Sequence, residues 1–169
     1  WGDERARVGN LLAMTTGLRG SEVVALQVGD IREDRVYVRH SWSKQDGLKG
    51  TKTGEERTVP LLREVRSELL AIAAASPHGQ GDDQFIFLHV DPARPMRVDQ
   101  LRKGLAKALE KAGISDWRDR GVCVHSWRHF YASRMADVLD ERTMKLTGHK
   151  TAAVFEVYSS HRTERQLRE

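Results

Sequence analysis

Residues 3–22 read DERARVGNLLAMTTGLRGSE, and this stretch predicts a helix that ends in a turn and leads into a second, short helix. Apolar positions recur at helical intervals from Asp3 to Thr16, behind acidic residues that favour the positive end of a helix dipole. Gly17 stands where such a helix would stop. Ser21 can cap the second helix, which we expect to run through Leu26.

The next part of the chain has the pattern of a small antiparallel sheet. Arg35–Arg39 alternates as a half-buried strand does, and Ser43–Gly50 is rich in turn-forming residues. Thr53–Glu56 then has the composition of a hairpin turn before a further strand at Arg57–Leu61. These segments predict three antiparallel strands.

Helical periodicity returns after this sheet. A short apolar segment at Phe85–Leu88 is expected to be buried, and Thr151–Glu169 could hold one helix and a charged tail. Four further helices are expected over residues 62–75, 98–112, 125–138 and 141–146. The sequence contains no internal repeat and no long linker, so we expect a mainly α fold with a small three-stranded antiparallel β-sheet, in a single domain over residues 1–169.

Composition excludes several classes of protein. Hydrophobic residues make up 39% of the 169 residues, without an apolar run long enough to cross a bilayer, so a cytoplasmic protein with no membrane partner is expected. Cys123 is the one cysteine, which excludes an internal disulfide and a zinc site with paired thiolates. The formal net charge of +4 is compatible with a polyanionic partner. The first residue is Trp1, which suggests a fragment of a longer protein.

Two generic motifs fail on inspection. Gly148–Thr151 resembles the end of a phosphate-binding P-loop, but its Lys does not follow a Gly and the upstream Gly is missing. His125 and His129 stand four residues apart, as in a zinc-binding helix, yet Ser126 occupies the position where a metalloprotease needs Glu. The sequence therefore supports neither a nucleotide nor a metal as cofactor.

Five separated pieces carry the functional information when they are taken together in their order. They are Thr16–Glu22, Thr51–Gly54, His125–His129, Leu146–His149 and Tyr158. This set resembles the catalytic domain of the tyrosine recombinases, the phage-integrase family, and the resemblance runs from about Leu11 to His161. It implies the integrase catalytic-domain fold and a site-specific DNA recombinase that integrates or recombines DNA through a 3′-phosphotyrosyl link.

These five segments contain arginine and histidine side chains that can bind the oxygens of a phosphodiester. Arg19 and Arg128 present planar, permanently charged forks that match phosphate oxygens in pairs. His125 precedes Arg128 by three residues, so one helix face carries both. The resemblance implies that His125 and His149 bond the phosphate or assist proton transfer and that Glu22 supports the active-site Arg or His. His129 is expected to have a packing or supporting role.

The remaining two catalytic positions are a general acid and a nucleophile. The resemblance assigns Lys52 as the acid that protonates the departing 5′-oxygen, with Lys44 and Lys49 as rivals in the same turn-rich stretch. It assigns Tyr158 as the nucleophile, whose phenol requires a base or nearby cations to attack at neutral pH. Tyr37 and Tyr131 are the alternatives, although a mid-strand and a core position are expected for them.

The resemblance also implies partners. It implies double-stranded DNA as substrate, a homotetramer on DNA formed by protomers that are monomeric in isolation, and neither ATP nor a metal. Family members commonly carry a separate N-terminal DNA-binding domain, and the sequence has no counterpart of it. Two other functions stay open: strand relaxation of the type IB topoisomerase kind, and a DNA-binding module with a silent site.

Overall fold

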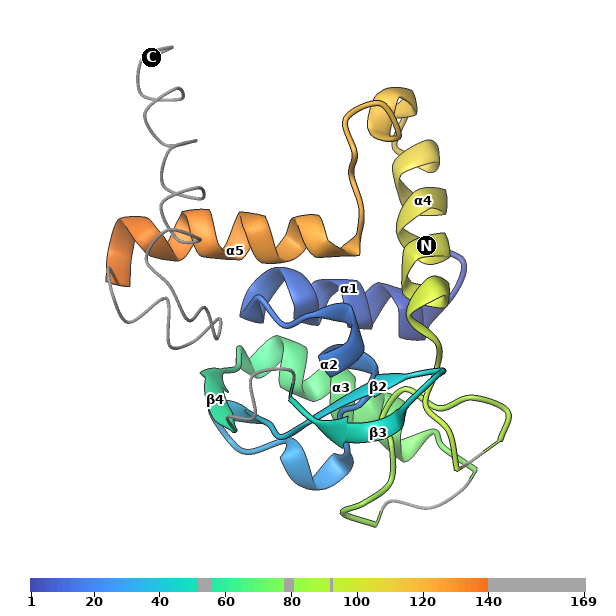
Figure 1. The fold of residues 1–169 in the computed structure, drawn as a ribbon, viewed down its shortest axis with the longest axis vertical. Helices are drawn as coiled ribbons and strands as arrows, with labels where there is room; N and C mark the ends of the chain where they lie inside the picture. Colours follow the sequence, from blue (N-terminus) through green and yellow to red (C-terminus); the bar gives the residue numbers. More distant parts are fainter. Residues whose placement is uncertain (52–55, 78–80, 92, 140–169) are drawn as a thin grey trace.

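The first helix lies at the centre of the fold, because other helices pack against it on several sides. A computed structural model describes residues 1–51, 56–77, 81–91 and 93–139. Helix α1 (Glu4–Thr16) begins at Asp3, whose carboxylate accepts hydrogen bonds from two backbone N–H groups, and it ends at Gly17 in the left-handed conformation with φ 68°. In Figure 1 α1 lies between α5 on one side and the strands with α2 and α3 on the other. The expected first helix is therefore confirmed at both ends.

Two long helices pack on α1 and are joined to it by one polar side chain. They are α4 (Val98–Lys111) and α5 (Val124–Leu139), and both contact α1 (Figure 1). The buried amide of Asn10 donates to the carbonyl of Leu101 in α4 at 3.1 Å and accepts from the indole N–H of Trp127 in α5 at 2.9 Å. A buried polar group needs such partners, so Asn10 specifies how the three helices meet.

The strands form two small antiparallel pairs. The outer strands β1 (Arg35–Val38) and β4 (Arg57–Pro60) pair with each other, and the inner strands β2 (His40–Ser43) and β3 (Gly47–Gly50) form a hairpin between them. The mainly helical class with a small antiparallel sheet is confirmed. The four strands pair as two two-stranded sheets, however, and not as one three-stranded sheet. Most of the expected turn at Thr53–Glu56 lies outside the described residues.

Short helices connect these layers. Helix α2 (Gly20–Val24) begins one residue before Ser21, and its N-cap is Arg19. The prediction that Ser21 caps this helix is therefore wrong: Glu22 reaches back to the backbone N–H of Arg19 at 2.8 Å and closes the first turn instead. The described residues also form two 3₁₀ turns, η1 (Val28–Asp30) after α2 and η2 (Ser115–Trp117) between α4 and α5.

The apolar core lies where α1, α2, α3 (Arg63–Ala74), α4 and the β1–β4 pair meet. The expected helices over residues 62–75, 98–112 and 125–138 match α3, α4 and α5, while those at 141–146 and 151–169 lie outside the described residues. The Phe85–Leu88 segment is buried, as expected. Fully buried members of the core include Val8, Leu12, Val23, Val36, Val59, Leu69, Phe87 and Leu101. Among the described helices, we find none with the length and apolar character to cross a membrane.

Candidate active site

The turn that follows α1 places Arg19 beside a buried carboxylate. Glu22 is 1% exposed, and its two oxygens accept from Arg19 through the backbone N–H at 2.8 Å and through Nη1 at 2.9 Å. Arg19 is the N-cap of α2, so both bonds depend on the short helix that Glu22 closes. The side chain of Arg19 remains 22% exposed. Glu22 therefore fixes Arg19 while leaving part of its guanidinium accessible to an anion.

A second arginine reaches the same carboxylate from the sheet. Arg57, the first residue of β4, donates from Nη1 to one oxygen of Glu22 at 3.1 Å and from Nη2 to the other at 2.7 Å. This is a two-bond, fork-to-fork pair, the geometry in which Arg binds carboxylate most strongly. The side chain of Arg57 is 9% exposed. Two guanidinium groups thus share one carboxylate.

The pKa of Glu22 reflects this arrangement. Burial alone would raise the pKa of this carboxyl, but the hydrogen bonds and charge of Arg57, with a smaller contribution from Arg19, lower it below its ordinary value of 4.5. Glu22 is therefore ionised at neutral pH. The group of three carries one negative and two positive charges, so its net charge is +1.

Arg128 is held against the end of α1. Its Nη1 donates to the carbonyl oxygen of Gly17 at 3.0 Å, and the side chain is 1% exposed. The left-handed backbone of Gly17 aims that carbonyl, and the ring of Tyr131 lies where a Cβ at this position would stand, at 2.5 Å. A guanidinium that has lost most of its water attracts an anion more strongly than an exposed one. Gly17 therefore positions one member of the expected phosphate clamp.

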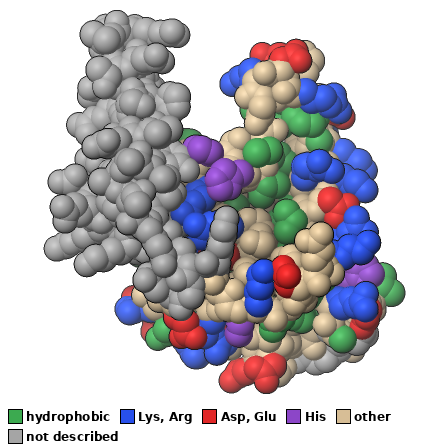
Figure 2. Space-filling model, viewed as in Figure 1, with side chains coloured by type: hydrophobic (Ala, Val, Ile, Leu, Met, Phe, Trp, Pro, Cys, Tyr) green, Lys and Arg blue, Asp and Glu red, His purple; other side chains and the backbone are tan. Residues whose placement is uncertain are grey.

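His125 lies near both arginines on the first turn of α5. The pKa of His125 lies below its ordinary 6.5, because surrounding protein replaces part of its hydration and because His129, Arg128 and Arg19 add positive charge. The rings of His125 and His129 meet edge to face, with centroids 5.1 Å apart. Figure 2 shows histidine and Lys/Arg side chains gathered on one face. The structure thus brings Arg19, His125 and Arg128 into one electropositive site.

His129 differs in part from its expected packing role. It is exposed in the described structure, and its ring contacts that of His125. Three of the predicted catalytic residues, Lys52, His149 and Tyr158, lie outside the described residues. Their assignment stays a prediction.

Three of the rival residues, Lys49, Tyr131 and Tyr37, have ordinary structural surroundings. Lys49 pairs with Asp46 at 2.6 Å on the exposed β2–β3 hairpin. Tyr131 is buried on Gly17, and burial raises the pKa of its phenol, which disfavours the phenolate that attack requires. Tyr37 lies on β1, where the guanidinium of Arg32 stands over its ring at 5.4 Å. None of these environments prepares the residue for the chemistry of an acid or a nucleophile.

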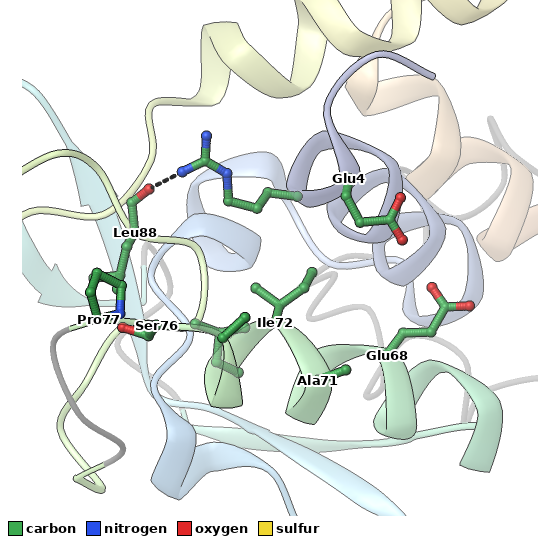
Figure 3. Close-up of a pocket in the computed structure, with 10 residues that line it drawn as sticks. Glu4, Glu68, Ala71, Ile72, Ser76, Pro77 and Leu88 are labelled. Atoms are coloured by element: carbon green, nitrogen blue, oxygen red, sulfur yellow. Dashed lines mark hydrogen bonds between the residues drawn. The ribbon is translucent and has the colours of Figure 1, made fainter.

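A cavity elsewhere in the protein does not belong to this site. It has a volume of about 390 Å³, lies between the start of α1 and α3, and is lined mainly by apolar side chains such as Ile72, Pro77 and Leu88 (Figure 3). Arg5 spans one side of it with a bond to the carbonyl of Leu88 at 3.0 Å. Arg19 follows the opposite end of α1, about 20 Å away at 1.5 Å per residue. Within the part of the chain that the structure describes, no three His, Cys, Asp or Glu side chains are grouped as a metal site would need.

Two residues that support the site were not singled out from the sequence. Arg57 belongs to the expected Arg57–Leu61 strand, but its pairing with Glu22 is a tertiary contact that the local pattern does not show. Asn10 is a single polar residue within an apolar helical pattern, a signal that could have marked it as an interhelical link. Both make contacts with residues that are distant in sequence.

Solved structures with the same fold include integrases and recombinases, some of them in complex with DNA. The integrase of transposon Tn1549, solved in complex with transposon right end DNA, has a TM-score of 0.72 at 18% identity, covering 99% of this chain and 61% of that one. The XerA recombinase has a TM-score of 0.70 at 20% identity, with 99% and 58% covered. A lambda integrase dimer bound to a COC′ core site has a TM-score of 0.64 at 17% identity, with 93% and 42% covered.

These relatives are longer than the chain, which spans about three fifths of the length of the Tn1549 integrase structure. The sequence matches no curated protein. The sequence profile of the phage integrase family matches residues 3–165, nearly the whole chain. With the Arg19, His125 and Arg128 cluster already assembled in the expected order and fold, the protein belongs to the phage integrase family.

Proposed function

We propose that the chain is the catalytic domain of a site-specific DNA recombinase that breaks and rejoins DNA. The observation that carries this proposal is the joint placement of Arg19, His125 and Arg128, two of which are fixed by Glu22 and by the Gly17 carbonyl. Two guanidiniums and an imidazole beside one another match the nonbridging oxygens of a phosphodiester. The solved relatives bound to DNA support the same substrate class.

The proposed reaction conserves the phosphodiester bond energy in a protein link. The phenol oxygen of Tyr158 bonds to the scissile phosphorus, and the bond from phosphorus to the 5′-oxygen breaks. The phenol proton passes to a base, for which the neutral imidazole of His125 is suited, and Lys52 protonates the departing 5′-oxygen. A 5′-hydroxyl from a second strand then attacks the phosphotyrosine and restores the phenol.

The assembly that performs this reaction is also part of the proposal. Rejoining strands from two duplexes requires more than one active site, and we propose four protomers on two duplexes, formed from chains that are monomeric without DNA. We further propose that a separate DNA-binding unit helps this domain grip the duplex, because the domain carries a net charge of only +4. Action on DNA agrees with the cytoplasmic location that the composition predicts.

The first test is covalent capture from DNA of random sequence. Nicked duplexes with a randomised region trap an enzyme of this kind, because the short strand that leaves after cleavage diffuses away. We expect the wild type to yield a protein–DNA adduct under denaturing conditions and Tyr158→Phe to yield none, because that change deletes the attacking oxygen. Tyr37→Phe and Tyr131→Phe should retain adduct formation. An adduct with Tyr158→Phe would refute the assignment, and plasmid relaxation without strand exchange would indicate a topoisomerase activity instead.

The second test concerns Lys52 as the general acid. We expect Lys52→Ala to slow cleavage of the captured sequence by about 10²–10⁴-fold. Replacing the bridging 5′-oxygen by sulfur should restore much of the rate, because a thiolate leaves without a proton. Lys44→Ala and Lys49→Ala are the matched controls and should cleave both substrates at the wild-type rate. If Lys44→Ala or Lys49→Ala cleaves slowly and the sulfur substrate restores its rate, while Lys52→Ala is not rescued, the general acid is that control lysine and not Lys52.

A further inference from the structure

The buried carboxylate of Glu22 is shared unequally between its two arginines. Arg57 occupies both oxygens with a side-chain fork, whereas Arg19 uses one side-chain N–H group, Nη1, together with its backbone N–H. Arg57 is 9% exposed and Arg19 is 22% exposed. Arg57 is therefore the principal counter-ion of Glu22, and Arg19 is held at its edge.

This inequality has an electrostatic consequence. A guanidinium in a full two-bond pair with a carboxylate has its charge neutralised and its fork occupied. Because Arg57 fills that position on Glu22, Arg19 cannot form the same two-bond pair. The charge of Arg19 and the remaining edge of its guanidinium are thus left for another anion.

We infer that Arg57 is a positioning residue for the strand-transfer reaction: it neutralises Glu22 so that Arg19 stays charged and available to a phosphate oxygen. The inference rests on the proposed phosphate-binding role of Arg19. Without Arg57, the nearest partner of the buried Glu22 carboxylate is Arg19. The guanidinium of Arg19 would then rotate to form a two-bond ion pair with Glu22. The site would then lose a unit of positive charge at the place where the phosphate binds.

The inference differs from a simple structural tie between β4 and α2. If Arg57 only tied these elements together, deleting Glu22 as well could not repair the loss of Arg57. If Arg57 acts by balancing the charge of Glu22, deleting that charge should release Arg19 again. The double variant Arg57→Met with Glu22→Gln therefore separates the two roles. Removing both partners of a buried ion pair also disturbs the fold less than removing one.

The chain contains a matched control. Arg39 on the segment between β1 and β2 pairs with the buried carboxylate of Asp30, with Nε to Oδ1 at 2.7 Å. Asp30 closes the first turn of η1 just as Glu22 closes that of α2. Arg39→Met therefore removes the arginine partner of a buried cap carboxylate at a place without a proposed catalytic residue.

The experiment measures cleavage of the nicked duplex recovered by covalent capture. We expect Arg57→Met to cleave about 10²-fold more slowly, the loss typical of removing one anion-binding group. The double variant should be at least tenfold faster than Arg57→Met, and Arg39→Met should cleave like the wild type. A double variant that is no faster than Arg57→Met, or an equal loss in Arg39→Met, would overturn the inference. Arg57→Lys keeps the charge without the fork and should fall between the wild type and Arg57→Met, which covers the case in which Arg57→Met does not fold.

A measurement without DNA keeps the inference separate from the proposed function. The pKa of His125 is lowered in part by Arg19, so NMR titration of its ring protons reports where the charge of Arg19 lies. Arg57→Met should raise the pKa of His125, and adding Glu22→Gln should return it toward the wild-type value. An unchanged pKa in Arg57→Met would refute the positioning role even if the enzyme is active. If no DNA yields an adduct while the pKa shifts as expected, the proposed function fails and the assignment of Arg57 as the counter-ion stands.

Discussion

Glu22 and Asp30 are two buried carboxylates with almost the same surroundings. Only the group around Glu22, which includes two arginines, has a net positive charge. Each is 1% exposed, accepts from the backbone N–H three residues earlier, and pairs with an arginine from the strand region. The difference is the residue at the helix start. At α2 it is Arg19, whose guanidinium joins the pair, and at η1 it is Gln27, whose amide donates to the carbonyl of Asp83.

This difference shows how a structural joint becomes part of an active site. A carboxylate and one arginine neutralise each other and hold two elements together. Adding a second arginine leaves one unit of positive charge, fixed in position and partly exposed. In this protein that charge lies beside His125 and Arg128, whereas the Asp30 joint has no such neighbours among the described contacts.

The largest expected effect is on stability, when each carboxylate is made neutral. Glu22→Gln should cost about 3–5 kcal/mol of unfolding free energy, because it removes the carboxylate from a buried pair whose arginine is 9% exposed. Asp30→Asn should cost less, about 1.5–3 kcal/mol, because Arg39 is 36% exposed and can turn to water. Urea unfolding of both variants measures the difference. A loss at Asp30 as large as that at Glu22 would break the comparison.

A smaller effect is expected when Gly17, whose carbonyl accepts a hydrogen bond from Arg128, is replaced by alanine. Gly17 and Gly47 both have φ 68°, so alanine meets the same backbone strain at each, about 1–2 kcal/mol. Only at Gly17 does the new Cβ meet a ring, that of Tyr131, which should add about 1–3 kcal/mol. Thermal unfolding gives the stability difference, and covalent capture should show that only Gly17→Ala loses activity. Equal losses in the two variants would mean that Tyr131 moves aside freely.

Acid should erase the stability that Glu22 provides. Because its pKa is lower in the folded protein than the ordinary 4.5, its contribution is present above that value and is lost as the pH falls through the lowered pKa. The stability gap between the wild type and Glu22→Gln should therefore narrow steadily below about pH 4.5. Urea unfolding across that range tests this, and a constant gap would show that Glu22 is not ionised in the folded protein.

The smallest effect concerns His125. Its pKa in the folded protein lies below the ordinary 6.5, so between these two values the unfolded chain binds more protons and stability falls as the pH drops. His125→Gln should flatten this part of the pH profile. An unchanged profile in unfolding experiments between pH 7 and pH 5 would show that the pKa of His125 is not lowered in the folded protein.

Part of this site was predictable from short segments, because the helix stop and the helical spacing of its residues are visible in the local sequence. The Gly17 helix stop and the shared helix face of His125 and Arg128 each lie within a few residues of sequence, and the family resemblance implied that Glu22 supports the active-site Arg or His. The joint of Arg57 with Glu22 was not predictable, because it is a tertiary contact between residues 35 positions apart in the sequence. Ser21 was taken as the cap of α2 because hydroxyl groups favour that position, but the longer Glu22 side chain closes the turn from within the helix.

The grouping of the strands was also beyond local patterns. The sequence marked where strands and turns lie, but alternation within a strand does not specify its neighbour. Val36 and Val59 face each other in the β1–β4 register and are both fully buried, so the core pairs these outer strands. The β2–β3 hairpin is left to pair with itself.

The nesting of the β2–β3 hairpin between β1 and β4 leaves its tip free to vary in length. Because β1 and β4 fasten the two ends of this excursion to the core, the tip around Lys44–Gly47 can change in length without altering the register that holds Arg57. Closing a longer loop is inexpensive, about 0.6 kcal/mol for each doubling of its length. An engineer could therefore graft a peptide or a reporter at this tip while the β1–β4 register that holds Arg57 is preserved.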